Sequence, residues 1–306
     1  MTNLLLCDPV SGVCEIPDRV SSAGNEPFAP TSDGAPADQI HITYFTDPIC
    51  STCWGIEPQL RKLKLEYGRY LTIDYRMGGL LPSWDVYNSG GISKPADVAH
   101  HWDEVSQHYQ MPIDGDVWLE DPLPSSYPPS VAFVAARYQS PEKAILFLRH
   151  IREMVFLHKK NITKWEHLAQ AASWVGLDVE RFRSDYETSA VAGFEDDLAF
   201  AKRLGVRGFP TLFLETNTRQ SKIYGFKPYS LFEEELHALK PDIQKTAFAL
   251  PAKELFHKFR SLTTQEFAVI TGQDFASAEK ILSEWAKAGS IERVSSKNGF
   301  LWLSVN

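Results

Sequence analysis

Residues 40–54 read IHITYFTDPICSTCW, and this segment decides the fold of the chain. Its first six residues are β-branched or aromatic, a composition typical of a buried strand. Cys50 and Cys53 follow that strand closely, and apolar residues on one face predict a helix from Cys53 to about Tyr67. The sequence therefore places a C-x-x-C pair where a strand passes into the first turn of a helix.

That position favours redox chemistry at the first sulfur. Backbone N–H groups and the positive end of the helix dipole stabilise a thiolate and lower the pKa of a cysteine from about 8.5. We expect Cys50 to be the nucleophile and Cys53, about one turn later, to be the resolving thiol. The same spacing also occurs in zinc sites, and an inert pair in a binding scaffold is a third interpretation.

The pattern on either side of this segment predicts a mixed α/β order. Strands are expected at 71–77, 210–214 and 221–224, and a helix from about 229 to 239. Between the second and third strands the sequence predicts only helices, at 95–110, 129–138, 141–159, 164–175, 178–187 and 190–204. The expected order is β-α-β, a helical block, and then β-β-α.

A length of 306 residues favours more than one folding unit. Residues 1–38 are rich in Pro, Gly, Ser and Asp and predict a flexible arm. Residues 39–240 form the expected main domain, with a helical insertion at about 80–205. After a linker, residues 250–306 predict three short helices and a hairpin around Lys297, Asn298 and Gly299, an α+β arrangement similar to a winged helix.

Three further features give the dithiol a family context. Trp54 follows the second cysteine, Pro58 lies five residues after it, and Gly208-Phe209-Pro210-Thr211 opens the third strand. The segment resembles the thioredoxin superfamily, and the large helical insertion resembles its DsbA family. This resemblance implies that Pro210 is a cis proline facing the cysteines. It also implies that Phe209, Pro210, Thr211 and Trp54 contact a substrate.

A narrower resemblance rests on Asp47-Pro48-Ile49-Cys50, on Met77-Gly78-Gly79-Leu80 and on the C-terminal extension. These features are similar to the predicted protein disulfide isomerase branch, which includes FrnE-like proteins and the YjbH/SpxH adaptors. The resemblance to the adaptors implies a role in delivering a transcription regulator to the ClpXP protease. Two departures weaken the redox chemistry: Ser51-Thr52 lacks a histidine, and Tyr44 stands where related proteins carry a carboxylate.

Cys7 and Cys14 lie in the N-terminal arm, and three interpretations apply to them. They are two exposed thiols of no special role, a labile disulfide that exchanges with Cys50, or part of a metal-binding arm such as the adaptors carry. We expect no cofactor and no metal at the dithiol.

Charge and hydropathy limit the partners. A formal net charge of -8 argues against a protein that coats nucleic acid, and residues 251–306 hold seven Lys or Arg against six Asp or Glu. No signal segment or membrane span is expected, which predicts a cytoplasmic protein. The leading hypothesis is a disulfide oxidoreductase or isomerase acting on a thiol-containing client protein. The alternative is an adaptor without turnover that serves a Clp-type protease.

Overall fold

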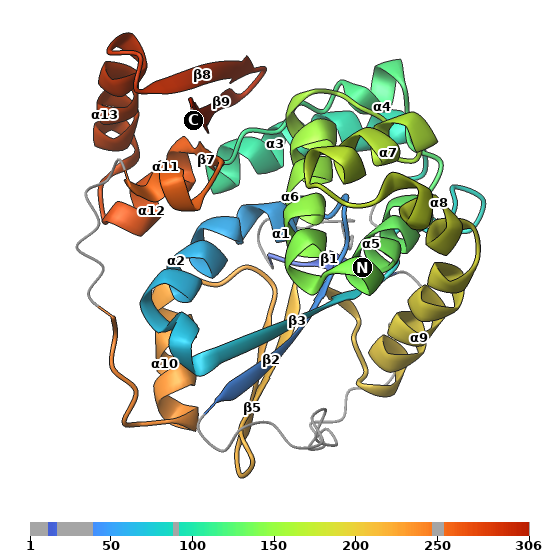
Figure 1. Cartoon of the computed structure of the whole chain (residues 1–306), viewed down its shortest axis with the longest axis horizontal. Helices are drawn as coiled ribbons and strands as arrows, with labels where there is room; N and C mark the ends of the chain where they lie inside the picture. Colours follow the sequence, from blue (N-terminus) through green and yellow to red (C-terminus); the bar gives the residue numbers. More distant parts are fainter. Residues whose placement is uncertain (1–11, 17–38, 88–91, 247–253, 306) are drawn as a thin grey trace.

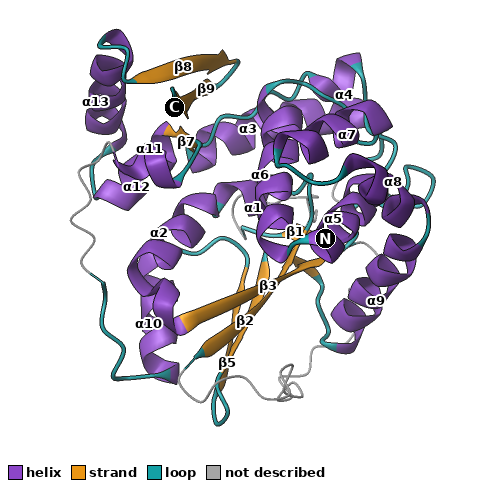
Figure 2. Cartoon of the chain, in the orientation of Figure 1, coloured by secondary structure: helices purple, strands orange, loops and turns teal. Residues whose placement is uncertain are grey.

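The computed structural model describes residues 12–16, 39–87, 92–246 and 254–305. A four-stranded sheet lies at its centre, and Figure 2 shows helices on both sides of it. Its strands are β2 (Ile40–Thr46), β3 (Leu71–Met77), β5 (Thr211–Glu215) and β6 (Gln220–Tyr224), in the order β3-β2-β5-β6. β2 pairs parallel with β3 and antiparallel with β5, as expected of a thioredoxin fold.

The helix after β2 is broken in two. α1 spans Ser51–Gly55 and α2 spans Glu57–Tyr67, with Ile56 between them at φ -91° and ψ 1°. Pro58 has no N–H to donate to the carbonyl four residues earlier, so the regular helical ladder stops there. The sequence predicted one helix starting at Cys53. The structure differs from that prediction in the break. Cys53 lies within the short α1, and Cys50 is its N-cap.

The two faces of the central sheet are covered by different helices. α10 (Tyr229–Leu239) packs beside α2, since the Tyr67 hydroxyl donates to Glu233 over 2.9 Å. α9 (Ser189–Arg203) covers the opposite face, where the rings of Phe45 and Phe200 lie 5.4 Å apart (Figure 1). The alternation of side chains along β2 therefore sends Tyr44 toward the dithiol and Phe45 toward α9.

The helical insertion agrees closely with the predicted helices. It contains α3 (Pro95–Tyr109), α5 (Tyr127–Gln139), α6 (Pro141–Leu157), α7 (Trp165–Trp174) and α8 (Val179–Glu187), followed by α9. The sequence did not predict the four-residue α4 (Val117–Glu120) or the 3₁₀ turn η2 (Gly68–Tyr70). In the described residues, no helix is long and apolar enough to cross a membrane.

The C-terminal unit has the element order of a winged helix. It consists of α11 (Leu255–Lys258), β7 (Ser261–Thr263), α12 (Thr264–Thr271), α13 (Phe275–Lys287), β8 (Ile291–Ser296) and β9 (Gly299–Ser304). The strands form a sheet in the order β7-β9-β8. The sequence predicted the helices and the hairpin but missed β7, which is only three residues long.

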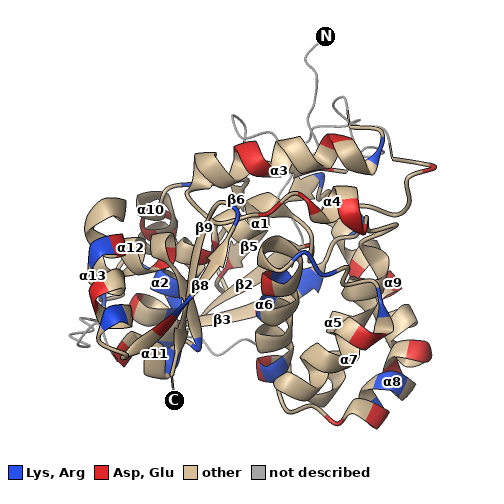
Figure 3. Ribbon diagram, turned by 90° about the horizontal axis from the view of Figure 1, so that it is seen from above, with Lys and Arg blue, Asp and Glu red and all other residues tan. Residues whose placement is uncertain are grey.

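The C-terminal unit packs firmly against the rest of the molecule. Its apolar cluster, which includes Phe267, Leu282 and Trp302, also takes in Leu65 of α2. At the other end, Lys297 forms ion pairs of 2.7 Å with both Asp103 and Asp116 of the insertion. Basic and acidic residues alternate over the outer helix α13 (Figure 3).

Candidate functional site

Cys50 and Cys53 lie at the start of α1, as predicted. Cys50 is the N-cap residue, and its sulfur accepts a hydrogen bond of 3.2 Å from the Cys53 backbone N–H. Both are free thiols, and both are completely buried. The dithiol is therefore assembled but closed to solvent in this state.

The pKa shifts of the two sulfurs do not follow the prediction. Burial, together with the neighbouring Cys53, raises the pKa of Cys50 well above its ordinary value, and the negative charge of Asp47 adds to this. Burial also opposes ionisation of Cys53, but hydrogen bonding with Cys50 and the positive charge of Arg152 lower the pKa of Cys53. The expectation of a Cys50 thiolate does not hold here because the helix start cannot outweigh full burial.

Arg152 supplies a buried positive charge beneath the dithiol. This α6 residue is fully buried and pairs with Glu57 at 2.6 Å. It also donates to Thr46 Oγ1 over 2.6 Å and to the carbonyl of Asp47 over 3.1 Å. No sequence pattern indicated Arg152, because it lies more than ninety residues from the cysteines, in a helix with ordinary amphipathic spacing.

Asp47 is a second residue that sequence reasoning did not assign to the site. Its carboxylate accepts hydrogen bonds from the backbone N–H of Ile49 (3.0 Å) and of Leu80 (2.8 Å) and from the Ser126 hydroxyl (2.8 Å). Burial raises the pKa of Asp47 to about 6 despite these bonds. The signal was present, since a carboxylate three residues before Cys50 is unusual between a buried strand and a buried helix.

Pro210 follows a cis peptide bond with Phe209, at the start of β5. The two-residue strand β4 (Gly208–Phe209) stands just before it. Phe209 is completely buried, and the Thr211 hydroxyl is turned inward to donate to the carbonyl of Gly208 over 2.7 Å. Phe209 and Thr211 are both fully buried, so in this state they are not open to a substrate.

The site is closed by the N-terminal arm. Residues Cys14–Glu15 form β1, which pairs antiparallel with β4 so that Cys14 stands opposite Phe209. The Cys14 sulfur lies 3.2 Å from the Cys50 sulfur and is fully buried. The prediction of a flexible arm does not hold for residues 12–16, and of the three interpretations of Cys14 the exposed thiol is wrong. Cys7 and the rest of the arm lie outside the described residues.

Trp54 is not part of a substrate-binding rim. Its indole is completely buried, stacks on Phe156 at 5.5 Å and donates to the Pro112 carbonyl over 3.1 Å. The Arg149 guanidinium lies 4.4 Å above the ring. The expectation that Trp54 contacts a substrate is corrected: it anchors the dithiol helix to the insertion.

Metal binding finds no support in the part of the chain that the structure describes. Within those residues no group of three or more His, Cys, Asp or Glu side chains could hold a metal ion. Cys14 is disulfide-bonded, so its sulfur has no thiolate to offer a zinc ion in this state.

This chain is similar to known proteins both in a family model and in individual relatives that match most of its length. A family model described as thioredoxin matches residues 44–234. The ClpXP adapter protein SpxH of Halalkalibacterium halodurans is 32% identical over 305 residues, covering 97% of this chain and 96% of that protein. SpxH of Bacillus subtilis is 31% identical and covers 89% and 92% of the two chains.

Solved structures share the fold of the main unit. A putative protein disulfide isomerase from Nitrosomonas europaea has a TM-score of 0.57 at 23% identity, covering 65% of this chain and 97% of that one. The cytosolic disulfide reductase DsbM from Pseudomonas aeruginosa has a TM-score of 0.53 at 24% identity, covering 65% and 99%. At these identities the similarity extends to the fold and not to the activity.

Proposed function

Since the chain belongs to the thioredoxin family and, within it, to the SpxH family of ClpXP adapter proteins, we propose that it is an adaptor that binds a client protein and presents it to the ClpXP protease. The client is expected to contain thiols, and the compartment is expected to be the cytoplasm. Because of this family membership, the adaptor hypothesis takes precedence over the oxidoreductase hypothesis that the sequence favoured.

One observation carries this choice. Both sulfurs of the dithiol are buried, and the Cys14 sulfur lies in contact with Cys50. Turnover on outside disulfides needs an accessible thiolate, whereas the burial that raises the pKa of Cys50 keeps it protonated. The site in this state suits a binding scaffold better than a catalyst.

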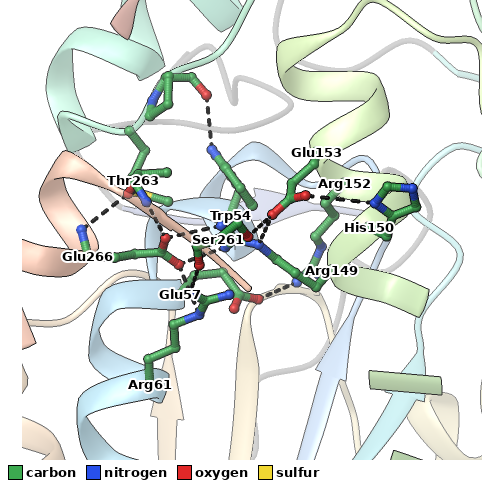
Figure 4. Close-up of polar contacts among 12 residues, drawn as sticks. Trp54, Glu57, Arg61, Arg149, His150, Arg152, Glu153, Ser261, Thr263 and Glu266 are labelled. Carbon is green, nitrogen blue, oxygen red and sulfur yellow. Dashed lines mark hydrogen bonds and ion pairs between the residues drawn. The ribbon is translucent and has the colours of Figure 1, made fainter. Parts of the chain in front are cut away.

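The docked C-terminal unit also supports a binding role. Buried ion pairs between Arg61 and Glu266 (3.1 Å) and between Arg149 and Glu266 (2.6 Å) tie it to α2 and to the insertion (Figure 4). We propose that residues 250–306 form a small separate domain that extends the docking surface and does not contact nucleic acid.

The second candidate is a protein disulfide oxidoreductase or isomerase. It is favoured by the placement of Cys50 at a helix start, where its sulfur accepts the Cys53 N–H, and by the short Cys14–Cys50 contact. In this alternative Cys50 attacks a client disulfide, a mixed disulfide forms, and Cys53 releases the client. The N-terminal arm would have to leave first.

Protein half-lives in cells separate the two functions. Clients of an adaptor are proteins whose half-life lengthens when the chain is deleted and lengthens equally when ClpX or ClpP is removed. The doubly substituted Cys50→Ser/Cys53→Ser chain is expected to restore their degradation. Failure of deletion to stabilise any ClpXP substrate contradicts the adaptor proposal.

Insulin reduction tests the alternative in vitro. We expect the purified chain to give no more insulin reduction than the Cys50→Ser variant. A clear rate for the wild-type chain that is lost in Cys50→Ser would favour the oxidoreductase instead. The two assays have different readouts, so each of the two hypotheses can be rejected independently of the other.

A further inference from the structure

The N-terminal residues 12–16 occupy the position at which a thioredoxin-like edge can receive an added strand. Besides the pairing of β1 with β4, the Ile16 N–H donates to the Arg207 carbonyl over 2.8 Å. Strand addition of this kind uses main-chain hydrogen bonds for affinity and side-chain pockets for specificity. The arm thus binds the chain's own edge in the way that an extended peptide would.

The side chain that the arm brings to the dithiol is a cysteine. Cys14 Sγ lies 3.2 Å from Cys50 Sγ and 3.3 Å from Thr52 Oγ1. A disulfide bond is about 2.05 Å long, so the first distance is a non-bonded contact between two sulfurs close enough to react. Cys14 is itself disulfide-bonded, whereas Cys50 and Cys53 are free thiols.

We propose that residues 12–16 are an internal substrate of the dithiol, held on the β4 edge as an added strand so that Cys14 exchanges its disulfide with Cys50. The edge is then available to an extended, cysteine-containing segment of another protein only after the arm leaves. This inference does not depend on delivery to ClpXP, because it concerns the chain's own cysteines.

The exchange balances without any outside oxidant. Cys50 gives up its proton and its thiolate attacks Cys14 Sγ; the Cys50–Cys14 bond forms while the existing disulfide of Cys14 breaks. The released sulfur leaves as a thiolate and takes up the proton. Cys53 then attacks Cys50 Sγ and displaces Cys14 as a thiol, so that two electrons pass from the Cys50–Cys53 pair to the arm disulfide.

Two glycines make the docking of the arm testable. A Cβ on Gly208 would lie 2.5 Å from the Cys14 carbonyl oxygen and 2.7 Å from Val13 Cγ1. Gly12 has φ +67°, and a Cβ there would lie 2.8 Å from Phe226 Cβ. Gly208→Ala therefore obstructs the docked arm from β4, and Gly12→Val obstructs it against Phe226, and neither change touches a cysteine of the dithiol.

The first experiment measures how fast Cys50 reacts with iodoacetamide in the full chain. Obstruction of the arm in either glycine variant is expected to raise the rate about tenfold or more, since it shifts a local opening equilibrium. The matched control is Gly68→Ala, because a Cβ on Gly68 would meet nothing within 4 Å. Rates that stay at the wild-type value in either glycine variant overturn the docking.

The second experiment traps the exchange. In Cys53→Ser the first step can occur but the second cannot, so acid quenching, alkylation and peptide mass mapping should detect a Cys14–Cys50 disulfide in a glutathione buffer. The same link must be absent from Cys53→Ser/Cys14→Ser and reduced in Cys53→Ser/Gly208→Ala. If Cys53→Ser shows only alkylated Cys50 at every glutathione ratio, Cys14 is not a substrate and the proposal fails.

Discussion

Arg149 of α6 and Glu266 of α12 form a two-point ion pair, with Nη1–Oε1 and Nη2–Oε2 distances of 2.6 and 3.1 Å. The Glu266 side chain is completely buried. It also accepts the Thr263 N–H over 2.7 Å, which closes a capping box at the start of α12. One carboxylate therefore both begins a helix of the C-terminal unit and fastens that unit to the insertion.

Loss of this carboxylate is expected to be costly. In Glu266→Gln the buried Arg61 guanidinium loses the carboxylate that it pairs with, and Arg149 keeps only Glu153, which costs about 3–5 kcal/mol for a broken buried pair. Urea unfolding followed by tryptophan fluorescence measures the loss. The exposed Glu292→Gln is the matched control, and equal stability of the two variants would contradict the prediction.

Acid should weaken the same junction through Glu153. Burial alone would raise its pKa, but the Arg149 charge, the neighbouring His150 and the hydrogen bond from the Ser261 hydroxyl hold the pKa of Glu153 at about 2. A lowered carboxyl pKa gives stability that is present above about pH 4.5 and is lost as the pH falls toward 2, about 3 kcal/mol in all. Glu153→Gln should flatten this dependence, while the exposed Glu180→Gln should not. Unfolding free energies measured between pH 2 and pH 5 provide the check.

Asp47 should make the free energy of unfolding depend on pH in the opposite direction. Its folded-state pKa of about 6 is raised, so its contribution is fully present below about pH 3.8 and is lost as the pH rises through 6. Relative to Asp47→Asn, the wild-type chain is expected to lose about 2 kcal/mol between pH 4 and pH 7. Urea titrations at each pH measure the difference, with exposed Asp242→Asn as the control. Parallel pH profiles for Asp47→Asn and wild type would refute the raised pKa.

Arg152 is expected to set the ionisation of Cys53. Arg152→Met removes the positive charge and should raise the pKa of Cys53, whereas Arg152→Lys keeps a charge and should raise it less. Thiolate absorbance at 240 nm, followed against pH in the reduced chain, measures the shift. Arg203→Met, an exposed change on α9, should leave the titration unchanged. Arg152→Met also removes the ion-pair partner of Glu57, whereas Arg152→Lys retains a cation for Glu57.

The sequence could predict what depends on local pattern. The strand at 40–46, the helices of the insertion and the helix at 229–239 follow from apolar periodicity and turn residues, and the structure confirms them. The position of Cys50 and Cys53 at a helix start follows from the same pattern. Very short elements such as β7 and α4 were missed because three or four residues carry no measurable period.

What the sequence could not predict depends on contacts between distant segments. Arg152 reaches the dithiol from a helix a hundred residues away, and Cys14 reaches it from an arm whose composition is typical of irregular chain. Trp54 was misplaced for a related reason: its neighbours Phe156 and Pro112 lie in the insertion, and local pattern does not reveal which aromatic side chains become buried.

The tip of the β8–β9 hairpin has a consequence for how the chain folds as it is synthesised. Lys297 pairs with Asp103 and Asp116, and the Asn298 amide donates to Asp103 and to the Ile113 carbonyl over 2.9 and 2.8 Å. The ribosome synthesises Asp103, Ile113 and Asp116 nearly two hundred residues before it reaches the hairpin tip. On the ribosome, α3 and the turn after it therefore wait for residues 297 and 298 to emerge before their final contacts can form.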